Sequence, residues 1–491
     1  MMIDSRTADA NESDGSLLYA ALRAVGALSP HAPAVVGFDG TVTSYRQLVE
    51  ATDAVAETLC SVAEFGRVVG VAVDDPVTFI AVYFAAAELG MVAVLLDTRS
   101  TPEEKARLVA QFDLKVLVFD GAAGSGSVEY EVVGTADAPH EYLPTDFVLH
   151  CTSGSTGVPK GIVMSQAAVM ARMRAWSREA GLLASDVVLC ALPAWHGHGT
   201  DILILPSLLS GATVVFTRGA LLTGRGLGRM ISNHGVTVIS GLPVMYQMLV
   251  AADGVDSSML GTLRLAMTAS APIAADTQAR FRERFGLPLR QGYGLGEIGM
   301  ITYDAEGAGN GTIGLPVRDI DWRLEPVDMS DEEPEVFELL VRGPSLARGY
   351  YRDPVAQASM FVDGWLRTHD LVAASAAGWF VRGRKSTFIN VTGNKVAPID
   401  VETALRKCGG VVDCAVVGIP DGDGGEQIAA LIVAAAGGDP ETVRRQIGSR
   451  LQPFQLPQQY TFVAAIPRTA VGKTDYRATK AIALGAGAAA I

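Results

Sequence analysis

Residues 151–161 read Cys151-Thr152-Ser153-Gly154-Ser155-Thr156-Gly157-Val158-Pro159-Lys160-Gly161 and place hydroxyls, glycines and one lysine in a single turn-forming segment. Glycine lets backbone N–H groups approach an oxyanion, hydroxyl side chains add neutral donors, and Lys160 adds a positive charge. The segment therefore predicts a phosphate-binding loop. The apolar runs on either side, 147–149 and 161–164, are typical of strands, so we expect a hairpin with this loop at its tip.

Length and charge limit the class of protein. A chain of 491 residues with 49% apolar content can bury large cores and divide into two or more domains. The formal charge of −14 argues against nucleic acid as a partner. No apolar run of about 18 residues is present, so no membrane span is expected. Five cysteines without metal-ligand spacing, and a polar N-terminus, predict reduced thiols, no secretory signal and a cytoplasmic location.

The order of strand-like and helical stretches predicts an α/β fold. The apolar runs 68–73 and 92–96 flank a helical stretch over 76–89, which is the pattern of parallel sheets. The segment 121–140 is rich in glycine, alanine and acidic residues, so we expect a surface loop there.

A shift in composition near Ser386 predicts a domain boundary, with one domain over 1–385 and a second over 386–491. The second contains two strand-like stretches, 411–419 and 428–435, which we interpret as part of a compact βα alternation. The Ala/Gly-rich tail over 481–491 is expected to fray.

Four further motifs follow the phosphate loop in order. They are Gln291-Gly292-Tyr293-Gly294-Leu295-Gly296-Glu297, Arg367-Thr368-His369-Asp370, Gly383-Arg384 with 393–398, and Pro467-Arg468-Thr469-Ala470-Val471-Gly472-Lys473. From about Tyr45 to Lys473 the chain resembles the acyl-adenylate-forming (AMP-dependent synthetase/ligase) superfamily, of the acyl-CoA ligase or aryl-acid-adenylating type. The resemblance implies a large N-terminal adenylation domain of parallel-sheet α/β subdomains with a β-barrel-like part, and a small, mobile α+β C-terminal lid.

The resemblance also implies ATP and Mg²⁺ as cofactors and a role for each matched residue. Lys473 would bridge the substrate carboxylate and the α-phosphate, Glu297 would hold Mg²⁺, and Asp370 would bind the ribose. A hard cation such as Mg²⁺ suits one carboxylate together with phosphate oxygens and water. The other residues implied in nucleotide binding are Thr152, Ser153, Gly154, Ser155, Thr156, Gly157, Lys160, Ala269, Ser270, Ala271, Gly292, Tyr293, Gly294 and Arg384, with Tyr293 stacked on adenine.

The pair Trp195-His196 concerns the acid that is activated. Amino-acid-activating relatives carry aspartate at the second position, so His196 disfavours an α-amino acid and resembles aryl, cinnamate and acyl ligases, in which this histidine gates the carboxylate. His196 and His198 could also suggest a metal site, but no third ligand is evident. By the same match, small and apolar residues line a pocket for a flat or extended acyl group rather than a dicarboxylic acid, namely Trp195, Ser240, Gly241, Met245, Ala269, Gln291, Gly292 and Leu295.

Three positions depart from the family pattern. Gly296 stands where a threonine usually bonds the α-phosphate, His369 replaces the glycine of Thr-Gly-Asp and is expected to be a surface replacement, and Ser386 replaces the usual hinge residue. The segment 393–398 favours a pantetheine thiol, of coenzyme A or an acyl carrier protein, as the acceptor. Delivery to an amine or another small nucleophile stays open.

Two rival functions are also open. Residues 294–299 match the Gly-x-Gly-x-x-Gly dinucleotide fingerprint, which would indicate an NAD-dependent oxidoreductase, although no clean βαβ pattern surrounds them. The three departures would also suit a non-catalytic binding homologue. Against that stand the charged residues in their expected places, Lys160, Glu297, Asp370, Arg384 and Lys473.

Overall fold

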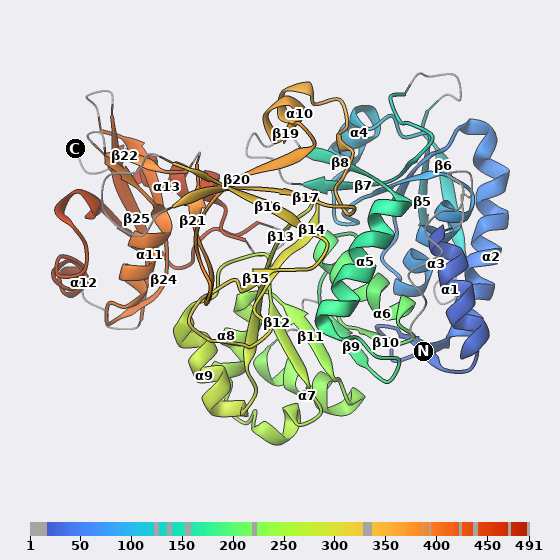
Figure 1. Cartoon of the computed structure of the whole chain (residues 1–491), viewed down its shortest axis with the longest axis horizontal. Coiled ribbons are helices and arrows are strands. Elements are labelled where there is room, and N and C mark those ends of the chain that lie inside the picture. The colour runs from blue at the N-terminus through green and yellow to red at the C-terminus, as the bar shows by residue number, and fades with distance from the viewer. Residues whose placement is uncertain are drawn as a thin grey trace.

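The computed structural model describes residues 17–121, 127–134, 140–152, 159–218, 223–327, 336–385, 387–391, 394–421, 425–435, 440–469 and 473–488. Figure 1 shows a large N-terminal part and, on the left, a smaller C-terminal part in orange and red. Of Thr152 only the backbone is described. Ser153, Gly154, Ser155, Thr156 and Gly157 lie outside the described residues, as do Ser386 and Gly393.

The first sheet is seven-stranded, in the order β18-β8-β7-β4-β3-β5-β6. Its central strands are parallel, and β8 pairs antiparallel with β7 so that Thr152 faces Lys160. The predicted hairpin on either side of the phosphate loop is therefore confirmed. The strands are β3 (Val68–Ala72), β4 (Val92–Leu95), β5 (Val116–Asp120), β6 (Val128–Val132), β7 (Asp146–Thr152), β8 (Lys160–Ser165) and β18 (Gly349–Tyr350).

The expected surface loop over 121–140 is only partly correct, because β6 lies within it and pairs antiparallel with β5 at the sheet edge. Most of its side chains are exposed. An exposed edge strand has no buried face to produce a clear alternation of apolar and polar residues, so little in the sequence pattern indicated this strand.

The second sheet is nine-stranded, in the order β15-β14-β13-β12-β11-β9-β10-β1-β2, and is parallel from β13 to β1. Strand β13 turns directly into the antiparallel β14, which places residues 296–298 in a tight turn. The strands are β1 (Pro33–Val36), β2 (Val42–Ser44), β9 (Val187–Cys190), β10 (Thr213–Phe216), β11 (Val238–Gly241), β12 (Leu265–Thr268), β13 (Leu289–Leu295), β14 (Gly299–Tyr303) and β15 (Leu315–Pro316).

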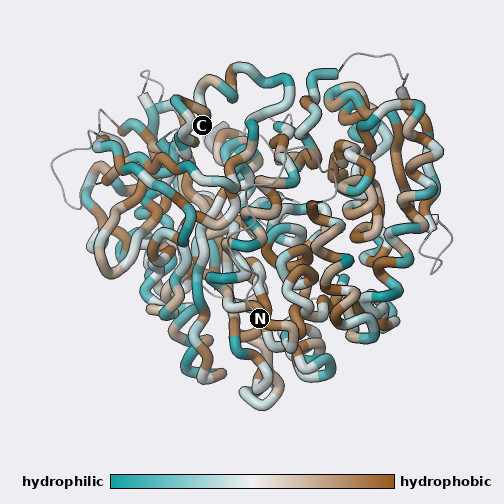
Figure 2. The backbone as a smooth tube through the Cα atoms, turned by 45° about the vertical axis from the view of Figure 1, so that its right-hand side comes forward, coloured by the Kyte–Doolittle hydropathy of each residue, from teal (hydrophilic) through white to brown (hydrophobic). Residues whose placement is uncertain are grey.

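Helices cover both sheets and fill the space between them. One face of each sheet shares a core with α1 (Leu17–Leu28), α2 (Tyr45–Val62), α3 (Pro76–Glu88) and α5 (Gln166–Ala180). Helix α3 is buried on nearly all sides, as its continuous apolar sequence requires. The outer face of the nine-stranded sheet packs on α7 (Gly224–His234), α8 (Pro243–Ala251) and α9 (Ala275–Phe285), and that of the other sheet on α4 (Pro102–Gln111). Figure 2 shows hydrophobic stretches running through these packed elements.

A five-stranded antiparallel sheet follows and leads into the C-terminal part (Figure 1). It contains β16 (Asp321–Pro326), β17 (Phe337–Arg342), β19 (Phe361–Val362), β20 (Trp365–Ser375) and β21 (Gly378–Arg384), with α10 (Pro354–Met360) leading into β19. The expected fold class, with large N-terminal sheets and a smaller C-terminal domain, is confirmed.

The C-terminal domain has cores of its own, built from residues between 389 and 483. Both predicted strand stretches are present, but they pair antiparallel with each other, so the helices flank them instead of alternating with them. The elements are β22 (Ile389–Val391), β23 (Asn394–Val396), α11 (Pro398–Arg406), β24 (Val411–Pro420), β25 (Glu426–Ala434), α12 (Pro440–Ile447), β26 (Gln459–Phe462) and α13 (Tyr476–Ala488).

The expectation of a fraying tail is wrong for residues 481–488, which belong to α13. Alanine has the highest helix propensity, and buried Ala483 packs in a core with Ala415 and Leu431 of the C-terminal sheet. Composition alone suggested flexibility because glycine and alanine occur together there. None of the helices in the described part of the chain has the length and apolarity of a membrane span.

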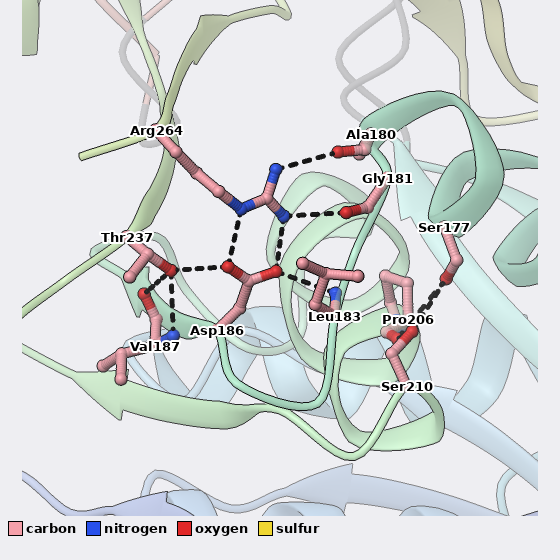
Figure 3. Close-up of polar contacts among 10 residues, drawn as sticks. All are labelled: Ser177, Ala180, Gly181, Leu183, Asp186, Val187, Pro206, Ser210, Thr237 and Arg264. Atoms are coloured by element: carbon pink, nitrogen blue, oxygen red, sulfur yellow. Dashed lines mark hydrogen bonds and ion pairs between the residues drawn. The ribbon is translucent and has the colours of Figure 1, made fainter. Parts of the chain in front are cut away.

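A buried carboxylate ties the starts of three strands together (Figure 3). Asp186 accepts from Arg264 Nε at 2.7 Å, from Thr237 Oγ1 at 2.7 Å and from the Leu183 backbone N–H at 2.8 Å. Arg264 also donates to the Gly181 carbonyl, just after α5, at 2.8 Å. Burial alone would raise the pKa of Asp186, but the hydrogen bond from Arg264 and the other donors hold it below its ordinary value.

We predict that Asp186→Ala lowers the free energy of unfolding by about 3 kcal/mol or more, because it removes the buried carboxylate that pairs with Arg264 and accepts from Thr237 and from the Leu183 N–H. The matched control is Asp321→Ala, which removes an ion pair with Arg342 in which both side chains are at least half exposed. Exposed pairs contribute about 1 kcal/mol or less. Urea unfolding of both variants measures the difference, and equal losses would contradict this assignment.

Candidate active site

Three predicted nucleotide-binding residues meet at one carboxylate. Asp370 on β20 lies opposite Arg384 on β21, and Arg384 Nε donates to Asp370 Oδ1 at 2.7 Å. Tyr293 on β13 donates its hydroxyl to the other oxygen, Oδ2, at 2.6 Å. Burial and the neighbouring Asp370 raise the pKa of Tyr293, so its hydroxyl keeps its proton. The structure thus brings the Tyr-Gly and Thr-His-Asp motifs together.

Glu297 lies in the turn between β13 and β14, and Tyr350 on β18 donates a hydrogen bond to its Oε1. The Lys160 ammonium lies 5.5 Å from the centre of the same tyrosine ring and 3.9 Å from Asp353 Oδ2. Lys160, at the end of the predicted phosphate loop, and Glu297, the predicted metal ligand, therefore both contact Tyr350. Among the described residues, no group of three or more histidines, cysteines and carboxylates could hold a metal ion.

Lys473, from the C-terminal domain, reaches the same region. Its side chain is accessible to water, yet the protein around it partly desolvates the ammonium and lowers its pKa, and the Arg384 guanidinium lowers it further. The carboxylates of Glu297 and Asp370 act in the opposite direction. These interactions place the lysine near both N-terminal carboxylates.

His196 and His198 lie close to Lys473 and are both held neutral. Desolvation, followed by repulsion from Lys473, lowers the pKa of His196 to about 4. Desolvation and the neighbouring His196 lower the pKa of His198 to about 3. His196 Nδ1 accepts from the His198 backbone N–H at 3.2 Å, while Trp195 packs edge to face on the His196 ring.

The residues predicted to line the acyl pocket lie at neighbouring strand ends. Ser240 and Gly241 end β11, Gln291 and Gly292 lie on β13, and Met245 on α8 packs so close to Gly241 that a Cβ there would lie 2.6 Å from its sulfur. Larger residues at Gly241 would displace that methionine. Ala269 follows β12, which lies between β11 and β13, and Leu295 ends β13. Ser270 and Ala271, which were predicted to bind the nucleotide, come directly after Ala269.

A buried ion pair lies beneath these residues. Arg172 on α5 donates from Nη1 to Asp201 Oδ2 at 2.6 Å, and from Nη2 to the Gly296 carbonyl at 3.0 Å. Asp201 belongs to a π-helical segment, η2 (His198–Ile204), whose first residue is His198. One guanidinium therefore fixes both the turn that carries Glu297 and the segment that carries His198.

His369 proves to be a structural residue rather than a surface replacement. Its φ is +57°, in the left-handed region that favours glycine, which accounts for a glycine at this position in relatives. Its Nδ1 lies 3.0 Å from Oε1 of Glu338, a carboxylate only 1% exposed that also accepts from Arg367 and Lys385. The hydrogen bond holds the imidazole against a buried charge in spite of the unfavourable backbone.

Comparison with known proteins agrees with this geometry. The family model for AMP-binding enzymes matches residues 22–351, and the model for their C-terminal domain matches 400–473. The chain belongs to the AMP-binding enzyme family. It is 30% identical over 478 residues to the feruloyl-CoA synthase of an Amycolatopsis species, covering 91% of this chain and 95% of that protein.

Two further relatives extend the match. The chain is 30% identical to the indoleacetate–CoA ligase of Aromatoleum aromaticum, with 88% and 91% of the two chains covered. The ATP-bound MatB structure from Rhodopseudomonas palustris superposes with a TM-score of 0.81 at 24% identity, covering 94% of this chain and 98% of that one. The family resemblance indicated by the motifs is confirmed, and as an AMP-binding enzyme of the acyl-CoA ligase type the protein is an acid–thiol ligase.

The dinucleotide-binding alternative is wrong. Residues 294–299 join two antiparallel strands by a tight turn, whereas the fingerprint requires a strand, a turn and a helix whose N-terminus receives the pyrophosphate. Gly294 is needed for a different reason, because a Cβ there would lie 2.2 Å from the Gly299 carbonyl oxygen.

Sequence reasoning missed several residues that shape the site, among them Tyr350, Arg172, Asp201 and Glu338. Each acts across more than 25 positions of sequence through contacts that no local motif encodes. His198 was noticed only as a possible metal ligand. The weak signal available was an arginine at the helical spacing of apolar residues, as Arg172 is beside Val169, Met173 and Trp176 on the buried face of α5.

We predict that neutral His198 makes stability depend on pH. The folded protein takes up a proton on His198 only near pH 3, whereas the unfolded chain does so near the ordinary value of 6.5. The contribution of neutral His198 to the free energy of unfolding is therefore fully present above pH 6.5 and decreases as the pH falls. At pH 5, protonation of this one group in the unfolded chain lowers the free energy of unfolding by about 2 kcal/mol. Urea unfolding at pH 7.5 and pH 5 should show that His198→Gln loses about that much less than the natural protein; equal losses would contradict the prediction.

Proposed function

We propose that this enzyme uses ATP and Mg²⁺ to convert a carboxylic acid into an acyl-adenylate and then transfers the acyl group to a pantetheine thiol. One observation carries the proposal: Lys473 of the C-terminal domain lies within electrostatic range of Glu297, Asp370 and His196 of the N-terminal domain. Adenylation joins two anions, so it requires cations and oriented donors at the point where they meet.

In this proposal, Asp370 receives the ribose hydroxyls while Arg384 and Tyr293 fix the orientation of its two oxygens. Glu297, positioned by Tyr350, would hold the Mg²⁺ that screens the phosphates. Lys473 would bridge the carboxylate and the α-phosphate. Glu297 and Asp370 favour the charged form of Lys473, against the effect of burial and of Arg384, and in this proposal the ammonium serves as a positive charge.

His196 would guide the carboxylate toward the α-phosphate. Because His196 is neutral, it can approach Lys473 without strong repulsion and can hydrogen-bond the substrate without pairing with it as an ion. Gly296 removes one neutral donor to the α-phosphate, which costs about 1 kcal/mol of direct interaction. All the charged groups of the site remain, which favours an active enzyme over a non-catalytic homologue.

The acid is an aryl, cinnamoyl-like or other acyl acid rather than an α-amino acid. His196 stands where an aspartate would pair with a substrate ammonium, and Trp195 offers an aromatic ring, with the Arg99 guanidinium 5.7 Å from the ring centre. Two relatives at 30% identity are named for feruloyl and indoleacetate substrates, both of them aromatic acids. These observations favour a flat substrate.

Coenzyme A or the phosphopantetheine of a carrier protein is the proposed acceptor. A hollow of about 410 Å³ opens beside Pro159, next to the phosphate loop, and contains Arg99 and Arg107. The same hollow is also lined by Glu104 and by Asp97, which pairs with Arg99 at 2.9 Å, so the guanidinium charge is partly offset. The two relatives at 30% identity are both named for coenzyme A, which favours a pantetheine thiol over a simple amine. We further propose that the domains meet at residues 385 and 386, so that the C-terminal domain can rotate between the two half-reactions. A cytoplasmic location stays a prediction.

Pyrophosphate exchange across a panel of aryl, cinnamoyl, aliphatic and amino acids tests the first half-reaction. We expect ATP- and Mg²⁺-dependent exchange with aromatic acids and little with α-amino acids. The adenylate formed should then disappear on addition of coenzyme A or a pantetheinylated carrier protein. Consumption by an amine but by neither thiol would replace the proposed acceptor, and absence of exchange with every acid would refute the activation step.

Lys473→Ala should lower the exchange rate by about 10²-fold, as expected for loss of one preorganised charge. Transfer to the thiol from supplied acyl-adenylate should be largely kept, because the proposal uses this lysine only in adenylation. Lys480→Ala is the matched control, since that lysine lies on α13 of the same domain, about half exposed and 3.9 Å from Glu426. Equal loss of both half-reactions in Lys473→Ala would contradict separate roles for the two.

A further inference from the structure

A three-residue hydrogen-bonded chain lies beside His196. His198 Nε2 lies 2.7 Å from Ser240 Oγ, and its Nδ1 lies 2.9 Å from Ser270 Oγ. His198 is 5% exposed and Ser240 2% exposed, whereas Ser270 is only partly buried. The chain therefore leads from a buried strand end to an accessible hydroxyl next to the residues proposed to receive the acid.

The burial of Ser240 fixes the direction of the hydrogen bonds. A neutral imidazole donates through one nitrogen and accepts through the other. In the part of the chain that the structure describes, His198 is the hydrogen-bond partner found for the Ser240 hydroxyl. A buried hydroxyl that only accepted would leave its own hydrogen unpaired, which is costly. Ser240 therefore donates to Nε2, and the Nδ1–H group donates to Ser270.

Ser270 is then left with its own hydrogen to donate. Its φ is +70°, a left-handed conformation that is unfavourable for serine, and the bond from His198 Nδ1 helps to hold it there. No acceptor for the Ser270 hydroxyl is found among the described residues. The Ser270 hydroxyl is thus a donor held in a strained conformation in the region of His196. Such an arrangement points to a ligand atom that accepts a hydrogen bond from this hydroxyl.

The family resemblance implied a role for Ser270 in nucleotide binding. We propose instead, resting on the proposed function, that Ser270 donates a hydrogen bond to a neutral oxygen on the acyl body of the substrate. The substrate class is then an acid that carries a hydroxyl, ether or carbonyl oxygen in addition to its carboxylate. The oxygen on this second group is uncharged because His198, held neutral by burial, provides no positive charge to accompany an anion.

Matched acids test this inference. We would measure kcat/KM for pyrophosphate exchange with cinnamic acid and with its hydroxy and methoxy derivatives, substituted in turn at each ring position. At one ring position both oxygen-bearing acids should exceed the unsubstituted acid by about tenfold, the value of one hydrogen bond. Ser270→Ala should abolish that preference, and Ser270→Gly, which suits the left-handed backbone, should do the same with a relaxed loop.

The matched control is Ser210→Ala, which removes a partly buried hydroxyl bonded to the Pro206 carbonyl at 2.7 Å, in a region separate from the acyl site (Figure 3). It should keep the preference.

A preference for hydroxy but not methoxy acids would show that Ser270 accepts, which overturns the assigned direction. An equal rise in the KM for ATP with every acid in Ser270→Ala would assign the hydroxyl to the nucleotide and overturn the inference. If the natural protein catalyses exchange with these acids but shows no preference for the oxygen-bearing ones, the inference about Ser270 is overturned while the proposed function stands. No exchange with any acid would refute the proposed function as well.

Discussion

The arrangement of the N-terminal part depends on the buried ion pair between Arg172 and Asp201. Both side chains are almost fully excluded from water. Desolvation offsets much of the attraction in such a pair, so its main effect is to fix geometry rather than to add stability. The guanidinium also reaches the Gly296 and Ser345 carbonyls, so α5, the π-helical segment and the β13–β14 turn share one reference point. Glu297 and His198 are positioned relative to each other through it.

A second buried charge governs the approach to the C-terminal domain. Glu338 on β17 accepts from Arg367 and Lys385 and is hydrogen-bonded to His369. Burial alone would raise the pKa of Glu338, but the Lys385 and Arg367 cations, together with the hydrogen bond to His369, keep it below its ordinary value. Lys385 directly precedes the proposed hinge, and its backbone N–H donates to the His369 carbonyl at 2.8 Å. The chain is therefore anchored up to the residue before the hinge, and any rotation of the C-terminal domain has to begin after that anchor. The departure at His369 belongs to this anchor.

Much of the fold followed from sequence because its signals are local. Apolar runs bounded by turn residues identified β3, β4, β8, β24 and β25 within one or two residues and β7 within three, and five ordered motifs identified the family. The errors have one physical origin: they occur where local composition conflicts with tertiary packing. Strand β6 is exposed and so lacks alternation, and α13 is Ala/Gly-rich yet is stabilised by the burial of Ala483.

The candidate site was predictable where the family resemblance rests on a short motif, and not where a residue acts by positioning another residue. Asp370 and Arg384 stand in recognisable patterns, but the contact of Lys160 and Glu297 with Tyr350 requires the pairing of β18 with β8, strands almost 190 positions apart. The role of His198 depends on which neighbours bury it. Ser240 and Ser270 each hydrogen-bond one nitrogen of its imidazole ring. Because both nitrogens are already occupied by hydroxyls, His198 is a hydrogen-bonding residue and not a metal ligand.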